Sequence, residues 1–176
     1  MKRLRILMPA VLLVAAMVVS SQPADAKSRT LVATIHGAGG AVMDAGAPIL
    51  RGGTTYSIDA RLYSDGTASG FFDCVDVAGS TFPGDFRGPI TSWKKVGGKI
   101  TLSGTGKLFD LHGDPFPDTG MTSFEYTVTI QKFGGAGKGH WTLAVPFFAA
   151  AGFGDPICSE LLTSGRLVIK QFDWED

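Results

Sequence analysis

Apolar and polar residues alternate with a period of two along most of the chain after residue 30. The clearest case is "FEYTVTIQ" at 124–131, in which Phe, Tyr, Val and Ile alternate with Glu, Thr, Thr and Gln. "YSIDARL" at 56–62 repeats the pattern. A period of two is typical of a strand with one buried face, and no segment after residue 26 sustains the 3.6-residue period of an amphipathic helix. The pattern therefore predicts an all-β protein.

Turn residues separate these alternating runs into predicted hairpins. "SDGT" at 64–67, "GG" at 97–98 and "SG" at 164–165 each stand between two runs. Such pairs are typical of short hairpin loops. The predicted strands cover 31–35, 55–63, 68–77, 89–96, 99–109, 124–131, 141–145, 161–163 and 166–170. Segments 37–54, 110–120 and 146–159 are predicted to be irregular.

Eight to ten strands of this spacing favour a small antiparallel β-barrel, with a two-sheet β-sandwich as the alternative. The barrel is preferred because the strands are long for the chain and glycines lie inside them, where curvature is needed. Gly104 and Gly106, on the apolar face of one strand, indicate sharp coiling or close packing of another strand. No domain boundary is visible.

The first 26 residues have the layout of a secretory signal peptide. Lys2, Arg3 and Arg5 precede an apolar run at 6–19, and a short polar segment ends in "ADA" at Ala26. The run is shorter than the roughly 20 residues of a membrane span, which leaves an uncleaved anchor as the alternative. We therefore expect a single domain at 27–176, secreted or periplasmic, with no transmembrane segment after cleavage.

The charge balance gives no reason to expect a nucleic acid or an anionic membrane as partner. The chain has 16 basic and 16 acidic residues, and removal of residues 1–26 leaves 13 and 15, a net charge of −2. A polyanion partner would call for a basic excess. Another exported protein or a carbohydrate is the expected kind of partner.

The two cysteines, Cys74 and Cys158, are predicted to form a disulfide, because exported proteins meet an oxidising compartment. Two separate buried thiols are the alternative. Two cysteines alone do not complete a structural zinc site.

Strand and turn motifs give the chain a family resemblance. "YSIDARLYSDGTASG", "ITSWKKVGGKITLSGTG", "FEYTVTIQ" and "SGRLVIK" follow one another between Leu31 and Lys170. In this order they resemble the post-COAP module, a small secreted bacterial β-domain. The resemblance implies a compact extracellular β-barrel or sandwich and carries over no catalytic residues. The segment "DLHGDPFPDTGM" and the loop near Cys158 depart from the family pattern.

Candidate metal ligands are three histidines and three loop aspartates. His36, His112 and His140 are enough for a zinc site with an open position, but they lack HxH or HExxH spacing. The alternative is that the histidines are ordinary surface residues or hydrogen-bonded ones.

The aspartates of the loop that begins at residue 110 are candidate calcium ligands, because oxygen ligands from one loop can hold calcium. The alternative is a solvated turn, which uses the same residue types. The loop carries carboxylates at four-residue spacing, Asp110, Asp114 and Asp118. We expect no cofactor, with calcium or zinc as the alternatives.

Catalytic motifs are absent from the sequence. There is no G-x-S-x-G elbow. A glycosidase needs two carboxyl groups close together in one cleft. Asp73 and Asp76 lie three positions apart on a strand, which places them on opposite faces.

Aromatic residues supply the remaining candidates. Trp93, Phe147 and Phe148 are candidate surface-binding residues, whereas Trp141 is expected in the core. The apolar segment "VPFFAAAGFG" at 145–154 is expected to fold over a barrel end as a plug, with an exposed interaction patch as the alternative.

The resulting prediction is a non-catalytic β-barrel module with a binding or structural role. It rests on the expectation that the side chains pointing into the barrel are apolar and that no group of polar side chains comes together there. A lipocalin-like carrier of a small ligand is one alternative. A metal-dependent hydrolase that uses the loop His and Asp residues is the other.

Overall fold

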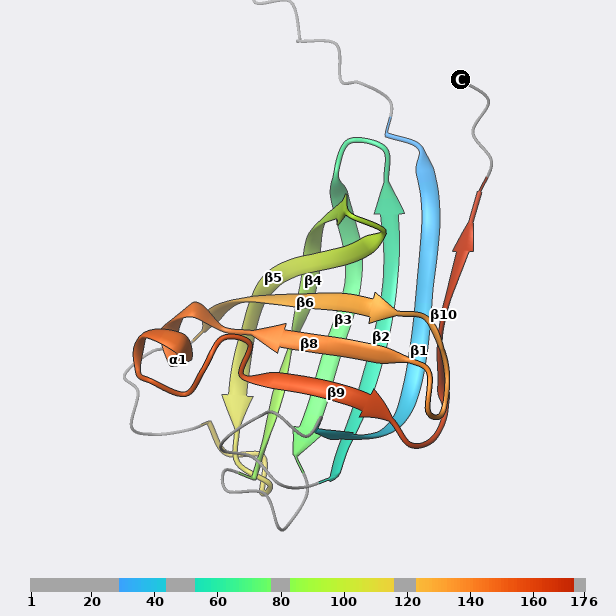
Figure 1. The fold of residues 1–176 in the computed structure, drawn as a ribbon. Coiled ribbons are helices and arrows are strands. Elements are labelled where there is room, and N and C mark those ends of the chain that lie inside the picture. Colours follow the sequence, from blue (N-terminus) through green and yellow to red (C-terminus); the bar gives the residue numbers. More distant parts are fainter. Residues whose placement is uncertain (1–28, 44–52, 77–82, 116–122, 173–176) are drawn as a thin grey trace, which may run out of the picture.

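The computed structural model describes residues 29–43, 53–76, 83–115 and 123–172, and these form a closed antiparallel barrel of 8 strands (Figure 1). Barrel strands that follow one another in the chain pair with one another, β9 pairs with β1, and β1 pairs with β2 to close the barrel. The preference for a barrel over a sandwich is confirmed. The strands are β1 (Leu31–Met43), β2 (Gly53–Tyr63), β3 (Thr67–Asp76), β4 (Gly84–Val96), β5 (Lys99–Phe109), β6 (Phe124–Lys132), β8 (His140–Ala144) and β9 (Cys158–Leu162).

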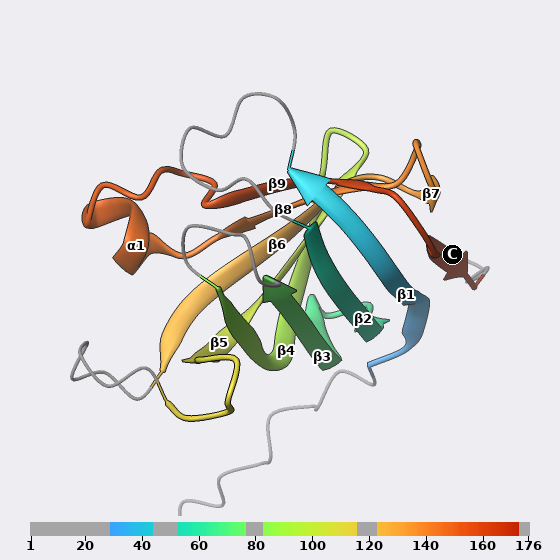
Figure 2. The ribbon, with the colours of Figure 1, turned by 90° about the horizontal axis from the view of Figure 1, so that it is seen from below.

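Two short strands and one short helix lie outside the barrel wall. β10 (Arg166–Gln171) pairs with β1 over residues 33–38, and β7 (Gly134–Gly135) pairs with the start of β10. The helix α1 (Pro146–Ala150) follows β8 and projects beyond the ends of β6 and β8 in both ribbon views (Figures 1 and 2).

The predicted hairpins at 64–67 and 97–98 are confirmed, and local chemistry explains both turns. The Asp65 carboxylate accepts hydrogen bonds from the Thr67 amide at 2.9 Å and from the Thr67 hydroxyl at 2.6 Å. At the second turn Gly97 and Gly98 have φ values of 57° and 81°. Both values lie in the left-handed region, which only glycine enters without steric cost.

β1 continues through residues 37–43, a stretch that the sequence predicts to be irregular. The reason is a close backbone approach. Gly39 has a φ of 154°, and a Cβ there would overlap the backbone of Ser164 and Gly165 in the turn between β9 and β10. The glycines of β1 therefore let this turn pack directly on the strand.

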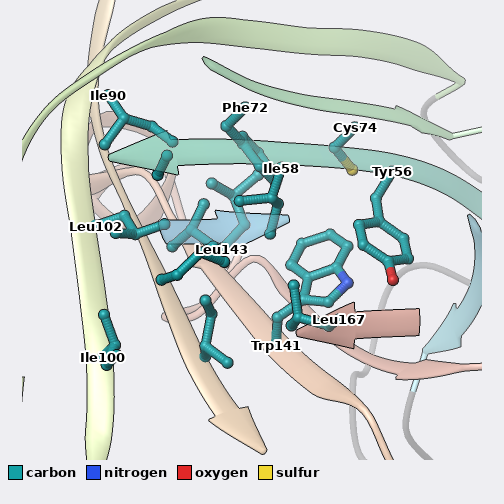
Figure 3. Packing of buried hydrophobic residues seen from close by; sticks show 14 of the residues in the cluster. Tyr56, Ile58, Phe72, Cys74, Ile90, Ile100, Leu102, Trp141, Leu143 and Leu167 are labelled. Atoms are coloured by element: carbon teal, nitrogen blue, oxygen red, sulfur yellow. The ribbon is translucent and has the colours of Figure 1, made fainter. Parts of the chain in front are cut away.

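The core fills the barrel interior and follows the predicted alternation. Along β2, Thr54, Tyr56, Ile58, Ala60 and Leu62 are all buried. Each fully buried large apolar side chain contributes about 1.5–3 kcal/mol. Ring contacts run through the interior, with centroid distances of 5.7, 5.5, 5.8 and 5.3 Å between successive members of the series Tyr56, Trp141, Phe72, Tyr126 and Phe86. Figure 3 labels the first three of these rings.

Close packing against the β5 glycines is also confirmed. A Cβ on Gly106 would lie 2.6 Å from the Phe86 ring, and one on Gly104 would overlap the Pro89 carbonyl. The missing side chains leave room for a ring inside the barrel.

Candidate functional site

Polar side chains enter the barrel interior at the end where β2 begins and β3 stops. Thr54 is 2% exposed and Glu160 is 0% exposed. In β9 the inward phase is Cys158, Glu160 and Leu162, so Glu160 occupies a position that the alternation reserves for a core residue. The expectation of an inward phase without converging polar groups is therefore wrong.

Thr54 lies between two carboxyl groups. Its Oγ1 is 2.9 Å from Asp76 Oδ1 and 3.1 Å from Glu160 Oε1. A threonine hydroxyl has one hydrogen and donates to one acceptor at a time, so the other close contact is favourable only when that carboxyl carries a proton. Burial raises the pKa of Asp76, opposed by the Thr54 hydrogen bond, which lowers it. The Asp76–Thr54–Glu160 group is hereafter called the carboxyl triad.

Two hydrogen-bonding groups next to the triad have no partner among the residues that the structure describes. The Tyr56 hydroxyl and the Trp141 Nε1 are both buried and unpaired. Tyr56 is 4% exposed and Trp141 is 0% exposed. Figure 3 shows the two rings together, with the hydroxyl oxygen and the indole nitrogen on the same side of the cluster. Burial raises the pKa of Tyr56 to about 12, so its hydroxyl keeps its hydrogen at neutral pH.

The strand registers place these donors beside the triad. Tyr56 is two residues from Thr54 on the same face of β2, about 7 Å along the strand. Trp141 stands directly opposite Glu160 in the pairing of β8 with β9. Four strands thus bring five polar side chains to one end of the interior, namely Tyr56, Trp141, Thr54, Asp76 and Glu160.

The predicted disulfide is not present in the structure. Cys74 and Cys158 are both buried free thiols, which corresponds to the alternative of two buried thiols. Hydrogen bonding involving Cys158, followed by burial, raises the pKa of the Cys74 thiol well above its usual range. Both are small, largely apolar groups that suit the barrel interior.

The three histidines are not brought together. His36, on β1, lies with its Nδ1 3.2 Å from Asp59 Oδ2, and both side chains are exposed. His140, on β8, lies with its Nε2 3.2 Å from Ser159 Oγ. Strand pairing places His140 across β9 from Val42, six residues along β1 from His36 and so about 20 Å away. Among the described residues no group of three His, Cys, Asp or Glu side chains has metal-binding geometry.

The aspartate loop forms a local turn. Asp110 Oδ1 accepts hydrogen bonds from the amides of His112 and Asp114, each at 2.9 Å. The bond from Asp114 is the main cause of the lowered pKa of Asp110. The exposed side chains of His112 and Asp114 do not join it in a ligand set, and Asp118 lies outside the described residues.

Of the predicted surface-binding residues, Trp93 has a structural role. Its Nε1 donates to the Tyr63 carbonyl at 2.8 Å and so ties β4 to the end of β2.

The apolar segment at 145–154 is partly exposed: Phe147 is 39% exposed and Phe153 is 37% exposed. Val145 is buried and Phe148 packs against the core, whereas no residue of α1 is fully buried, so the segment covers part of the barrel end and leaves part of its own surface exposed. The aromatic patch consists of Phe147, Phe148 and Phe153, whose rings contact one another and cover Phe124.

A second pair of carboxyl groups lies on the outer face of the barrel. As predicted, Asp73 and Asp76 are on opposite faces of β3: Asp76 joins the interior triad, while Asp73 contacts Asp85 of β4. Burial and the neighbouring Asp73 charge raise the pKa of Asp85 to about 6, against the lowering effect of Arg87. The Arg87 guanidinium is 3.5 Å from Asp85 Oδ2.

Sequence reasoning missed Glu160 and the pairing of Tyr56 with Trp141. The alternation in "CSELL" carried a signal for Glu160, because Cys158 and Leu162 fix the inward phase that it shares. The Tyr56–Trp141 contact joins β2 and β8, and no local pattern indicates it.

No described helix has the length and apolar character that crossing a membrane requires. A scan against protein-family models finds no match for this chain, and searches of curated proteins and of solved structures find no similar protein. The resemblance to the post-COAP module stays a prediction.

Proposed function

We propose that this chain is an exported, non-catalytic β-barrel module that binds one small ligand inside the barrel. The observation that carries the proposal is the pair of buried, unpaired donors on Tyr56 and Trp141. The signal-like segment at 1–26 supports export to a secreted or periplasmic location.

Unpaired buried polar groups are rare because they are unfavourable. More than about 90% of such groups in folded proteins have a partner, and each unsatisfied one costs about 1–3 kcal/mol. Two of them on contacting rings are the feature that favours a bound molecule at this position. A small ligand with a hydrogen-bond acceptor would relieve both costs at once.

The alternatives have less support. A purely structural barrel gains nothing from two unsatisfied donors and a buried carboxyl triad, because apolar side chains of similar size would fill the same space at lower cost. A metal-dependent hydrolase built on His36, His112 and His140 would need side chains from positions about 20 Å apart to converge.

Native mass spectrometry of the exported protein tests the proposal. We expect the wild-type protein, isolated from its own compartment, to carry a bound small molecule. The double variant Tyr56→Phe/Trp141→Phe should lose it, whereas the control Tyr63→Phe, at a position whose side chain is not buried, should keep it. A bare polypeptide mass for the wild type in repeated preparations would count against an interior ligand.

A second candidate function is supported by the aromatic patch. Exposed Phe147 and Phe153 have no charged residue between them in the chain, and such a surface suits an apolar partner face on another exported protein. Replacement of both residues by Ser should abolish pull-down of such a partner and leave the interior ligand bound.

A further inference from the structure

The strand β10 leaves part of one sheet edge open. Among the described residues it pairs only with β1 and, at Arg166 and Leu167, with β7. Figure 1 shows β10 at the side of the barrel, next to β1. We propose that a second copy of this chain pairs with this edge through its own β10, antiparallel and about a twofold axis at Gln171.

The backbone of β10 presents hydrogen-bonding groups on the open edge. The Phe172 N–H donates to the Val32 carbonyl at 2.9 Å, which fixes the groups that face β1. Successive residues of an antiparallel strand turn their N–H and C=O groups to opposite sides. The even-numbered residues of β10 therefore face β1, whereas Ile169 and Gln171 each direct an N–H and a C=O away from it. Such groups are a template for another strand.

β7 and Lys170 restrict the register in which two copies can pair. An axis at Ile169 would require Leu167 to pair with the partner's Gln171, but β7 already occupies the edge at Leu167. An axis at Lys170 would place two lysines directly opposite each other, and like charges in that position are destabilising. An axis at Gln171 avoids both problems.

With the axis at Gln171, side chains of the two copies are complementary. Lys170 stands opposite the partner's Phe172, and an ammonium group is attracted to an aromatic ring. Within one copy the Lys170 Nζ already lies 5.2 Å from the Phe172 ring centre. Val168, which is 37% exposed, stands opposite position 174 of the partner, where the sequence has Trp. A β-branched residue opposite an aromatic one stabilises a strand pair.

The pairing is short, so the dimer should be weak. The same register sets Ile169 opposite position 173, where the sequence has Asp, and this pair adds no side-chain attraction. A strand pair of this length buries less surface than the roughly 1,200 Å² of a stable complex. The two copies should therefore separate on dilution.

Sedimentation and amide exchange of the full chain at increasing concentration test the second copy as partner. We expect wild type to pass from monomer to dimer, with the Ile169 and Gln171 amides gaining protection in step, while β1 protects the Lys170 amide throughout. Gln171→Pro removes an outward N–H and no bond to β1, so it should fold and lose the dimer. The control Gln171→Ala keeps that N–H and should dimerise as wild type does. A wild type that stays monomeric, or a dimer that survives Gln171→Pro, overturns the inference.

Cysteine cross-linking tests the register. Gln171→Cys places two thiols opposite each other with Cα atoms about 5.5 Å apart, a distance that a disulfide spans. Mild oxidation should therefore give a covalent dimer of this variant. Lys170→Cys should give none, because its two Cα atoms lie about 7–8 Å apart in the same register. Wild type, whose Cys74 and Cys158 are buried, is the control. Cross-linking through Lys170→Cys in place of Gln171→Cys overturns the register and the inference with it.

Discussion

The rings of Tyr56 and Trp141 contact each other inside the barrel, 5.7 Å apart between centroids, and the polar atom of each is buried without a partner among the described residues. Tyr126 shows the contrast within the same core. Its hydroxyl lies 3.1 Å from the carbonyl oxygens of both Gly88 and Pro89. One buried tyrosine therefore has the usual hydrogen bonds of a core residue, while the other lacks them.

Two matched Tyr→Phe substitutions should differ in their effect on stability. Tyr126→Phe removes a satisfied hydroxyl and leaves carbonyls without a donor, so it should lower the free energy of unfolding by about 1–3 kcal/mol. Tyr56→Phe removes an unsatisfied hydroxyl, so in ligand-free protein it should leave that free energy unchanged or raise it slightly. Urea denaturation of both variants measures the difference. An equal loss in both would mean that the Tyr56 hydroxyl is bonded.

The carboxyl triad predicts a pH effect that Asp76 controls. The folded-state pKa of Asp76 is raised above its ordinary value of 3.8, so the folded state holds a proton that the unfolded state has released. Stability therefore falls as pH rises from 3.8 through the raised pKa. Asp76→Asn should remove this loss, so its stability relative to wild type should be higher at pH 7.5 than at pH 4. Urea midpoints at the two pH values provide the measurement, and a constant difference would argue against a raised pKa of Asp76.

Asp85 makes a separate contribution on the outer face. Its pKa is raised from 3.8 to about 6, so repulsion in the Asp73–Asp85 pair appears as pH rises from about 4 to about 6 and then stays constant. Asp85→Asn should raise the thermal midpoint at pH 7.5 and have a smaller effect at pH 4. Thermal unfolding at these pH values checks it. The matched control Asp114→Asn, at an exposed position, should leave the midpoint nearly unchanged.

The two thiols should be protected in the folded protein and free in the unfolded one. Cys74 and Cys158 are both about 3% exposed, and the raised pKa of Cys74 disfavours its reactive thiolate. A chromogenic thiol reagent should therefore react slowly at neutral pH in buffer and count two thiols in denaturant without reductant. A count of zero in denaturant would restore the disulfide that the sequence favours.

The barrel was largely predictable because its strands carry a local signal. The alternation at 124–131 marks both the strand and its inward face, since Phe124, Tyr126, Val128 and Ile130 are all buried. The continuation of β1 through Gly39 was not predictable, because it depends on the turn at Ser164–Gly165, which is distant in the sequence. How much of the 145–154 segment is covered was not predictable, because apolar composition alone does not say which side chains of a segment face the core.

The candidate site was much less predictable than the fold. Glu160 lies in a five-residue strand whose alternation is too short to stand out, and its contact with Thr54 spans 106 positions. The meeting of Tyr56 with Trp141 depends on closure of the barrel, which sets which strands face each other. Histidines, cysteines and loop aspartates are the residues that side-chain chemistry predicts, whereas the candidate site is formed by side chains that resemble ordinary core and strand residues.

A crystal structure of the exported protein, at a resolution that shows individual waters, tests the central claim most directly. We expect density larger than a water molecule between Tyr56 and Trp141, with one acceptor atom within hydrogen-bond distance of both the hydroxyl and the indole nitrogen. A single ordered water, or an atom of the protein itself, bonded to both donors would contradict it.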